Sequence, residues 1–338
     1  MLNIKLNIYY CIRIRGGTMK KNAILLGSVA VLVLLVFPVQ MVDASAISPP
    51  DMPGPFHVGF FKVWYSVPPY GRYWATIRYP ALHDGWRAAK DVTDAPYPCV
   101  VVANGFAGSE WNIKWIPKHL ASHGYVTICF TPPQKISGDT TQWASGFLGG
   151  IETLKTQNNR RFSPIYGILD NETFGAIGLS MGGGGCIEAT GTPNSDIDTA
   201  VALAPAGSAS VISAAGNITV PVQLQVGSND GMVPPAHVLS FYTKFIPNTT
   251  VKEYLVITGG NHVGFIDDFF ARFADKLGLD NPPGISFDEQ RRVSSKYFTS
   301  WFNYHLKHLS EYYTYIFGDE AQNDFDSGVL SDLRYTIP

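Results

Sequence analysis

The sequence predicts an α/β fold with a mostly parallel, doubly wound central sheet, flanked by helices and preceded by an antiparallel hairpin. Three observations lead to this prediction. Aromatic and β-branched residues alternate with polar ones over residues 54–81, short apolar runs then alternate with helix-like stretches, and a serine lies between two glycines after one of those runs.

Composition favours a large globular domain with an uncharged partner. The chain has 338 residues, of which 46% are hydrophobic, enough for a sizeable core. Lys and Arg together number 25 and Asp and Glu 27, so no strong field attracts nucleic acid or an anionic membrane.

Residues 1–46 are predicted to be a leader with a signal peptide, and Met19 is the expected start. Lysines at 20–21 precede an apolar run over 23–37, and small residues at 44–46 suit cleavage. The alternative is an uncleaved anchor, because a run extended to residue 42 reaches the roughly 20 residues that span a bilayer. A proline and a glutamine interrupt the run, which favours cleavage, and both readings place the domain outside the cytoplasm.

Residues 47–338 are predicted to form a single catalytic domain, because no internal repeat, charge block or low-complexity linker divides them. A Pro-Pro-Tyr-Gly turn separates the two strands of the initial hairpin. The buried strands expected after it are "PCVVVANG", "YVTICFTP", "FGAIGLS", "DTAVALAP", "VPVQLQVG" and "VKEYLVITGG".

Helices are expected around residues 115–123 and 147–157, from residue 180 onward, and over about 288–307. The last helix carries one stripe of side chains at intervals of four, namely Val293, Tyr297, Trp301 and His305. Strands alternating with helices support the doubly wound sheet.

The cysteines are predicted to be buried thiols. Cys11 belongs to the leader, which leaves Cys99, Cys129 and Cys186. Cys99 and Cys129 lie on neighbouring predicted strands but are out of step by about three residues, or about 10 Å. That separation exceeds the reach of a disulfide.

Ser180 is the candidate nucleophile, in the motif Gly178-Leu179-Ser180-Met181-Gly182. The motif follows a strand and opens a helical segment, which is the setting of a nucleophile elbow. Glycine is needed two residues before and after the serine, because a side chain there would collide with neighbouring backbone. The alternative is an ordinary strand-to-helix turn with a capping serine.

Asp230 and His262 are the candidate acid and base. Each follows a predicted strand, and the order Ser, Asp, His is the one this fold requires. The alternative for each is a loop residue bonded to its own backbone. His119 and His123 form an H-x-x-x-H pair that lacks the glutamate of a zinc protease, so a helix surface is expected there and no metal site.

An oxyanion hole is expected from two backbone amides. The first is the amide of Met181, directly after the nucleophile. The second is the amide of Phe106, in the loop "NGFAGSE" after the third predicted strand of the domain.

With these residues placed, the chain resembles the cutinase-type polyester hydrolases, including PET-degrading enzymes, of the α/β-hydrolase superfamily. The resemblance implies extracellular hydrolysis of carboxylic esters through an acyl-enzyme, with Ser180, Asp230 and His262 as triad and Phe106 and Met181 as hole. The matching stretches, over about residues 54–265, are "GPFHVGFFKV", "NIKWIPKHLASHGYV", "SPIYGILD", "GLSMGGGG", "SNDGMVPP" and "TGGNHVG".

The chain departs from that family in three ways. Ala206 occupies the place where relatives commonly have a tryptophan that clamps an aromatic acyl group, and no cysteine follows residue 186 to form the usual C-terminal disulfide. The segment 263–284 is longer, with four apolar side chains on one helical face: Phe265, Phe269, Phe273 and Leu277. Core packing is the favoured reading of that face, and a flap over the acyl site is the alternative.

The sequence therefore predicts a secreted, monomeric serine esterase of the cutinase type that needs no cofactor or metal. Short- to medium-chain esters are the expected substrates, with polyesters such as PET as an additional candidate. Ala206, Trp111 and Phe265 are the candidate cleft residues. The alternatives are an esterase or lipase of the same fold without polymer activity, and a catalytically silent exported binding protein.

Overall fold

The computed structural model describes residues 48–338, so the predicted leader lies outside the described residues. Residues 48–338 form one compact unit. Its strands are β1 (His57–Val67), β2 (Gly71–Ala81), β3 (Gly85–Trp86), β4 (Tyr97–Ala103), β5 (Val126–Thr131), β6 (Leu169–Leu179), β7 (Thr199–Leu203), β8 (Val222–Gly227), β9 (Lys252–Ile257) and β10 (Leu330–Thr336).

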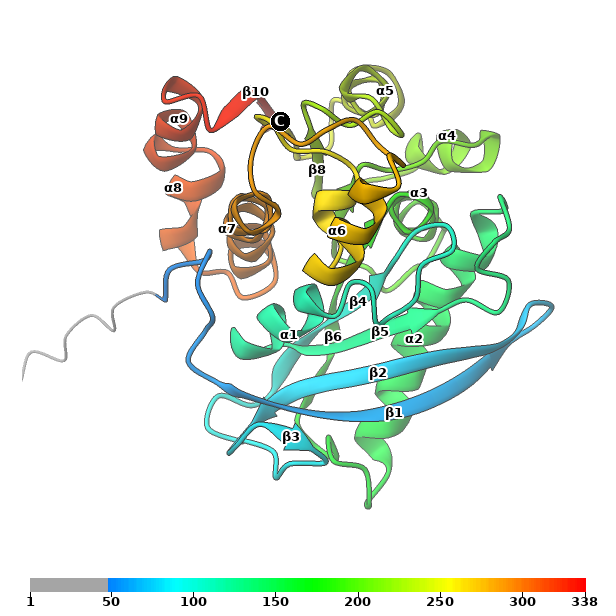
Figure 1. Cartoon of the computed structure of the whole chain (residues 1–338). Coiled ribbons are helices and arrows are strands. Elements are labelled where there is room, and N and C mark those ends of the chain that lie inside the picture. The colour runs from blue at the N-terminus through cyan, green and yellow to red at the C-terminus, as the bar shows by residue number, and fades with distance from the viewer. Residues whose placement is uncertain (1–47) are drawn as a thin grey trace, which may run out of the picture. The chain divides into compact units, whose positions relative to one another are not determined.

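These strands form one sheet in the order β10-β9-β8-β7-β6-β4-β5-β2-β1-β3 (Figure 1). The six neighbours from β9 to β5 are mutually parallel. Antiparallel strands β10 and β2 flank them. In the hairpin, β1 pairs with β2 from His57 opposite Ala81 to Val67 opposite Gly71. The predicted α/β-hydrolase fold is confirmed. Each of the six apolar runs predicted to be a buried strand forms a strand of this sheet, β4 to β9.

Helices cover both faces of the sheet. They are α1 (Trp115–Ser122), α2 (Thr141–Asn159), α3 (Met181–Thr190), α4 (Ala209–Ala215), α5 (Pro235–Ser240), α6 (Asp268–Lys276), α7 (Phe287–His305), α8 (Tyr313–Ile316) and α9 (Asp319–Asp326). On one face α2 packs against α3, and on the other α1 packs against α7 (Figure 1).

Two helices show how tertiary contacts modify the expected boundaries. The last predicted helix is confirmed as α7, which begins where the side chain of Ser286 accepts a hydrogen bond from the Glu289 amide at 3.1 Å. Helix α2 begins six residues earlier than expected, at Thr141 rather than 147. Its glycines weaken the helix signal, yet Gly146 permits close packing, because a Cβ there would lie 2.4 Å from the Phe130 ring.

The three described cysteines are free and buried, as predicted. In the parallel pair β4–β5, Cys99 lies opposite Val126 and Cys129 lies opposite Val102. The two cysteines are therefore three residues out of step along the strands.

The C-terminal strand β10 was not among the predicted strands. It pairs antiparallel with β9 at the edge of the sheet, and the residues of its sequence LSDLRYT are exposed or half-buried except for Leu330. Its polar composition is typical of an edge strand, which only the pairing with β9 identifies. Within residues 48–338, no helix combines the length and apolar character needed to cross a bilayer.

Candidate active site

Ser180 lies at a sharp turn between β6 and α3. Its backbone has φ 57° and ψ −119°, a conformation that a residue with a side chain rarely adopts. Its amide donates to the carbonyl of Leu203 at 2.9 Å, and its carbonyl accepts from the amides of Gly184 and Ala206, each at 2.9 Å. These bonds hold the strained residue in place.

The glycines around Ser180 are explained by close backbone approach. A Cβ on Gly178 would lie 2.1 Å from the carbonyl oxygen of Gly182, and one on Gly182 would lie 2.6 Å from that of Asn104. A Cβ on Gly185 would lie 2.3 Å from the Cβ of Trp143 on α2. The glycine run therefore lets the serine turn form and lets α3 pack closely against α2.

Asp230 and His262 form a buried pair at the carboxyl ends of β8 and β9. Asp230 Oδ2 lies 2.8 Å from His262 Nδ1, and the side chains are 0% and 6% exposed. Asp230 Oδ1 accepts from the amides of Met232 at 3.0 Å and Val233 at 2.6 Å. These bonds orient the carboxylate so that its other oxygen faces the imidazole.

One cavity of about 380 Å³ is lined by both Ser180 and His262. Apolar side chains form most of its remaining wall, including Met232, Phe270 and Phe273. No Lys, Arg, Asp or Glu is among the described residues that line it. The cavity therefore suits a neutral, apolar group placed against the serine.

The loop after β4 passes directly beside the serine. A Cβ on Gly105 would lie 2.6 Å from Ser180 Cβ and 3.1 Å from its Oγ. The amides of Gly105, Ala107 and Gly108 donate to internal acceptors at 2.7 to 3.1 Å. Among the described amides of residues 105–108, only that of Phe106 donates no hydrogen bond to another group of the protein. The Phe106 side chain lines the cavity.

A second amide is available at the start of α3. Met181 is the first residue of this helix, so its amide has no carbonyl one turn earlier to bond. The helix dipole also places partial positive charge at this end. A negative oxygen next to Ser180 would be stabilised there.

None of the three candidate cleft residues lines this cavity. Trp111 is 49% exposed and belongs to another hollow, where Lys62 Nζ lies 4.4 Å from its ring centroid. Phe265 is fully buried in the core, and its carbonyl accepts from Trp115 Nε1 at 2.8 Å. The Ala206 amide donates to the Ser180 carbonyl at 2.9 Å.

The predicted core packing of the 263–284 face is wrong for three of its four residues. Phe269, Phe273 and Leu277 are 75%, 58% and 57% exposed. Because α6 begins only at Asp268, Phe265 precedes the helix and does not share its face. The cavity wall is instead formed by the side of α6 that carries Phe270, Phe273 and Ala274.

Two side chains that the sequence did not single out hold the loop of His262. Gln290 of α7 is fully buried, accepts from the Asn261 amide at 2.9 Å and donates to the Asn261 carbonyl at 2.7 Å. Asp280 accepts from the His262 amide at 2.5 Å. Both lie far from the loop in the sequence and belong to no motif, so the sequence alone does not indicate their contacts.

His119 and His123 are not on a helix surface, contrary to expectation. They are packed against the N-terminal segment, where His123 Nε2 donates to the Met52 carbonyl at 2.8 Å and His119 Nε2 donates to the Pro50 carbonyl at 3.0 Å. Burial lowers the pKa of His119 to about 3 and that of His123 to about 4. Within residues 48–338, no three His, Cys, Asp or Glu side chains converge to hold a metal ion.

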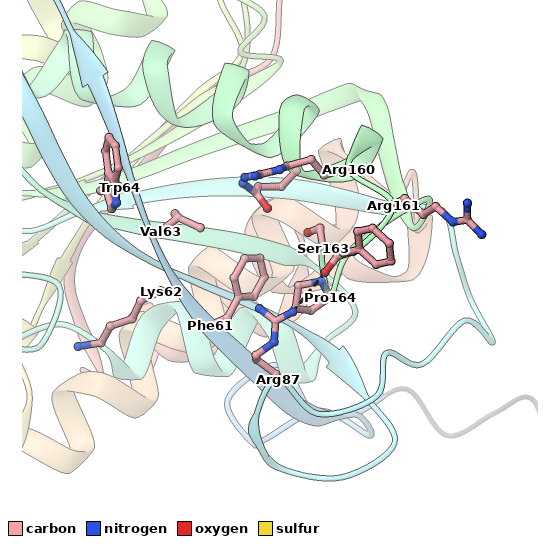
Figure 2. A pocket seen from close by; sticks show the side chains of 11 residues that line it. Phe61, Lys62, Val63, Trp64, Arg87, Arg160, Arg161, Ser163 and Pro164 are labelled. Carbon is pink, nitrogen blue, oxygen red and sulfur yellow. Dashed lines mark hydrogen bonds between the residues drawn. The ribbon is translucent and has the colours of Figure 1, made fainter.

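A larger cavity of about 630 Å³ lies elsewhere, between β1 and the end of α2. Figure 2 shows Arg160 pointing toward Trp64, while Arg161 points away. None of Ser180, Asp230 and His262 lines this cavity. It is therefore separate from the candidate active site.

Comparisons with known proteins find relatives that are named as hydrolases. Cutinase 1 of Thermobifida cellulosilytica is 28% identical over 167 residues, which cover 49% of this chain and 60% of the relative. Bis(hydroxyethyl) terephthalate hydrolase of Streptomyces coelicolor is 26% identical over 188 residues, which cover 55% of this chain and 54% of the relative. The chain thus spans about half to three-fifths of these relatives' length.

The family match covers much more of the chain. Residues 51–327 match the family described as PETase, PET hydrolase-like, and this range includes the serine turn, the buried Asp–His pair and the cavity between them. The protein belongs to the PET hydrolase-like family of α/β-hydrolases.

Proposed function

We propose that this protein is a serine carboxylic-ester hydrolase of the cutinase type. The observation that carries the proposal is the buried pair of His262 Nδ1 and Asp230 Oδ2, 2.8 Å apart, at a cavity that His262 shares with Ser180. With Nδ1–H donated to the carboxylate, Nε2 is free to accept a proton from the serine. The names of the relatives support the same reaction class.

In the proposed mechanism, His262 removes the proton from Ser180 Oγ as this oxygen attacks the ester carbonyl. The amides of Met181 and Phe106 stabilise the resulting oxyanion. His262 then passes the proton to the departing alcohol, leaving an acyl-enzyme. Water activated by His262 hydrolyses that intermediate and releases the carboxylic acid, while Asp230 stabilises the imidazolium.

The proposed substrates are neutral esters of short to medium acyl length, including polyesters. The lining contains no charged side chain apart from His262 when protonated, and several lining residues are also exposed at the rim, among them Phe106, Met232 and Leu279. An apolar rim of this kind suits a chain longer than the cavity itself. Ala206, in place of the tryptophan, favours the second candidate, a small-ester hydrolase without polymer activity.

We also propose that the protein acts outside the cytoplasm as a monomer and binds neither nucleic acid nor a cofactor. The basis is the apolar run at residues 23–37 behind a lysine pair, together with the balanced charge of the chain.

The test follows acid release by the purified protein and by its Ser180→Ala variant, from a short-chain aryl ester and from an aromatic polyester film. We expect the parent to cleave both and the variant to lose about 10³-fold or more of the activity. Cleavage of the small ester alone would select the second candidate. Equal activity of parent and variant would contradict the triad, and no activity in either would favour the binding protein.

A further inference from the structure

Asp280 lies in the loop between α6 and α7. Its two carboxylate oxygens accept hydrogen bonds from two different loops. Oδ2 accepts from the amides of His262 at 2.5 Å and Val263 at 3.3 Å. Oδ1 accepts from the amides of Gly231 at 2.9 Å and Asn281 at 2.8 Å.

The side chain therefore bridges the two loops that carry the acid and the base. Gly231 directly follows Asp230 in the loop after β8, and His262 lies in the loop after β9. A carboxylate that accepts several amide hydrogen bonds is held rigidly, and charge-assisted bonds of this kind are stronger than neutral ones. Movement of either loop would break bonds to the other.

Neighbouring contacts hold the bridging loop itself in place. Asn261 Nδ2 donates to the Asn281 carbonyl at 2.8 Å, and Asn229 Nδ2 donates to the Pro282 carbonyl at 3.0 Å. The Gly284 amide donates to the Gly259 carbonyl at 2.7 Å. Asp280 thus acts from a loop that is anchored on both sides of the Asp–His pair.

We propose that Asp280 is a positioning residue that sets the geometry of the Asp230–His262 pair and adds a negative charge that stabilises the imidazolium. The proposal rests on the proposed function for its catalytic consequence. The charge lies against the main chain of His262, so it favours the protonated imidazole. It does so without contacting the substrate, because Asp280 does not line the cavity.

Several groups face the His262 loop. Asp230 faces Nδ1 and Ser180 shares the cavity. From α7, the neutral Gln290 bonds Asn261, and the cation Arg291 donates to the Ile266 carbonyl at 2.9 Å and pairs with Asp268 and Asp288. Residues from α6 at the cavity are apolar. A change of charge at Asp280, which bonds the His262 amide, is therefore expected to appear in the pH dependence of kcat/KM.

The test compares the parent with Asp280→Asn, Asp280→Glu and the control Asp275→Asn, which removes one negative charge from an exposed position on α6. In Asp280→Asn we expect kcat to fall about tenfold or more, with KM within about twofold. The acid limb of the kcat/KM profile should move down by about half a pH unit or more, because the imidazolium loses a stabilising charge. Asp280→Glu should keep the parental acid limb with a reduced kcat, and the control should match the parent.

A merely structural role would lower the melting temperature without moving the acid limb, and that result would overturn the proposal. An unchanged kcat in Asp280→Asn would overturn it too. If Asp280→Asn does not fold by circular dichroism, Asp280→Glu decides, since parental kcat there overturns the proposal and a reduced kcat with the parental acid limb supports it.

Failure of the proposed function would be recognised separately. If the parent hydrolyses no ester, the pKa of His262 is followed by NMR in the parent, Asp280→Asn and Asp275→Asn. A downward shift in Asp280→Asn alone supports the positioning role, and equal values in all three overturn it.

Discussion

At the scale of single residues, the site depends on glycines, which have no side chain, as well as on the triad candidates. Ser180 adopts a backbone conformation with positive φ, and the oxyanion loop passes so close that only glycine fits at position 105. Three backbone hydrogen bonds, to Leu203, Gly184 and Ala206, stabilise the strained conformation of the serine.

Gly105→Ala is expected to reduce kcat/KM about 100-fold, because the added Cβ would lie 2.6 Å from Ser180 Cβ and would displace either the serine or the oxyanion loop. The measurement is hydrolysis of a short-chain aryl ester, with circular dichroism to verify folding. Gly138→Ala is the matched control, since a Cβ there meets nothing within 4 Å. Equal activity in the two variants would contradict the close approach.

At the scale of elements, α6 determines the shape of the cavity. One side of this helix carries Phe270 and Ala274 into the cavity wall, while Phe269 on another side is exposed. Phe270, Phe273 and Ala274 all line the cavity, so the helix provides much of the apolar surface available to an acyl group.

Phe270→Ala is expected to lower the preference for medium-chain over short-chain esters about tenfold, because the acyl chain loses an apolar wall. The ratio of kcat/KM for the two esters measures this. Leu277→Ala, at an exposed position at the end of α6 that does not line the cavity, should keep the parental ratio within about twofold. A similar change in both variants would show that α6 acts through helix stability rather than through the cavity wall.

At the scale of the whole molecule, the N-terminal segment of the described chain is joined to α1 and α7 by polar contacts. His123 bonds the Met52 carbonyl, the Gly54 amide donates to Ser122 Oγ at 2.9 Å, and Arg292 Nη1 bonds Asp51 Oδ2 at 2.7 Å. Helices from distant parts of the sequence therefore share one junction, in which Ser122 and His123 are buried.

Because His123 is buried in this junction, we expect the folded protein to lose stability at acidic pH. Burial lowers the pKa of His123 from 6.5 to about 4, so the unfolded chain binds a proton below pH 6.5 that the folded chain does not. The stability contributed by neutral His123 is complete above pH 6.5 and is lost as pH falls toward 4, at about 1.4 kcal/mol per pH unit.

Urea unfolding of the parent and His123→Gln between pH 4 and 7 tests this prediction. The parent should be more stable than the variant at pH 7, and the difference should shrink as the pH falls. His83→Gln, at an exposed position, is the control and should follow the parent. A difference that stays constant with pH would contradict neutral burial of His123.

The sequence by itself determined the α/β class, the order of the strands along the chain and the three triad candidates. Local patterns carry this information, because strands, helices and the serine turn each leave a signal within a few residues. The glycines flanking Ser180 are such a signal, since steric limits at a turn act on immediate neighbours.

Only the tertiary structure decided which residues line the cavity and which hold the loops. Trp111 and Phe265 were predicted at the cleft but do not line the cavity. The contacts made by Phe270, Asp280 and Gln290 could not be predicted, because these residues belong to no sequence motif. The physical reason is that side-chain direction depends on where each helix begins, and loop-to-loop hydrogen bonds join residues that are distant in the chain.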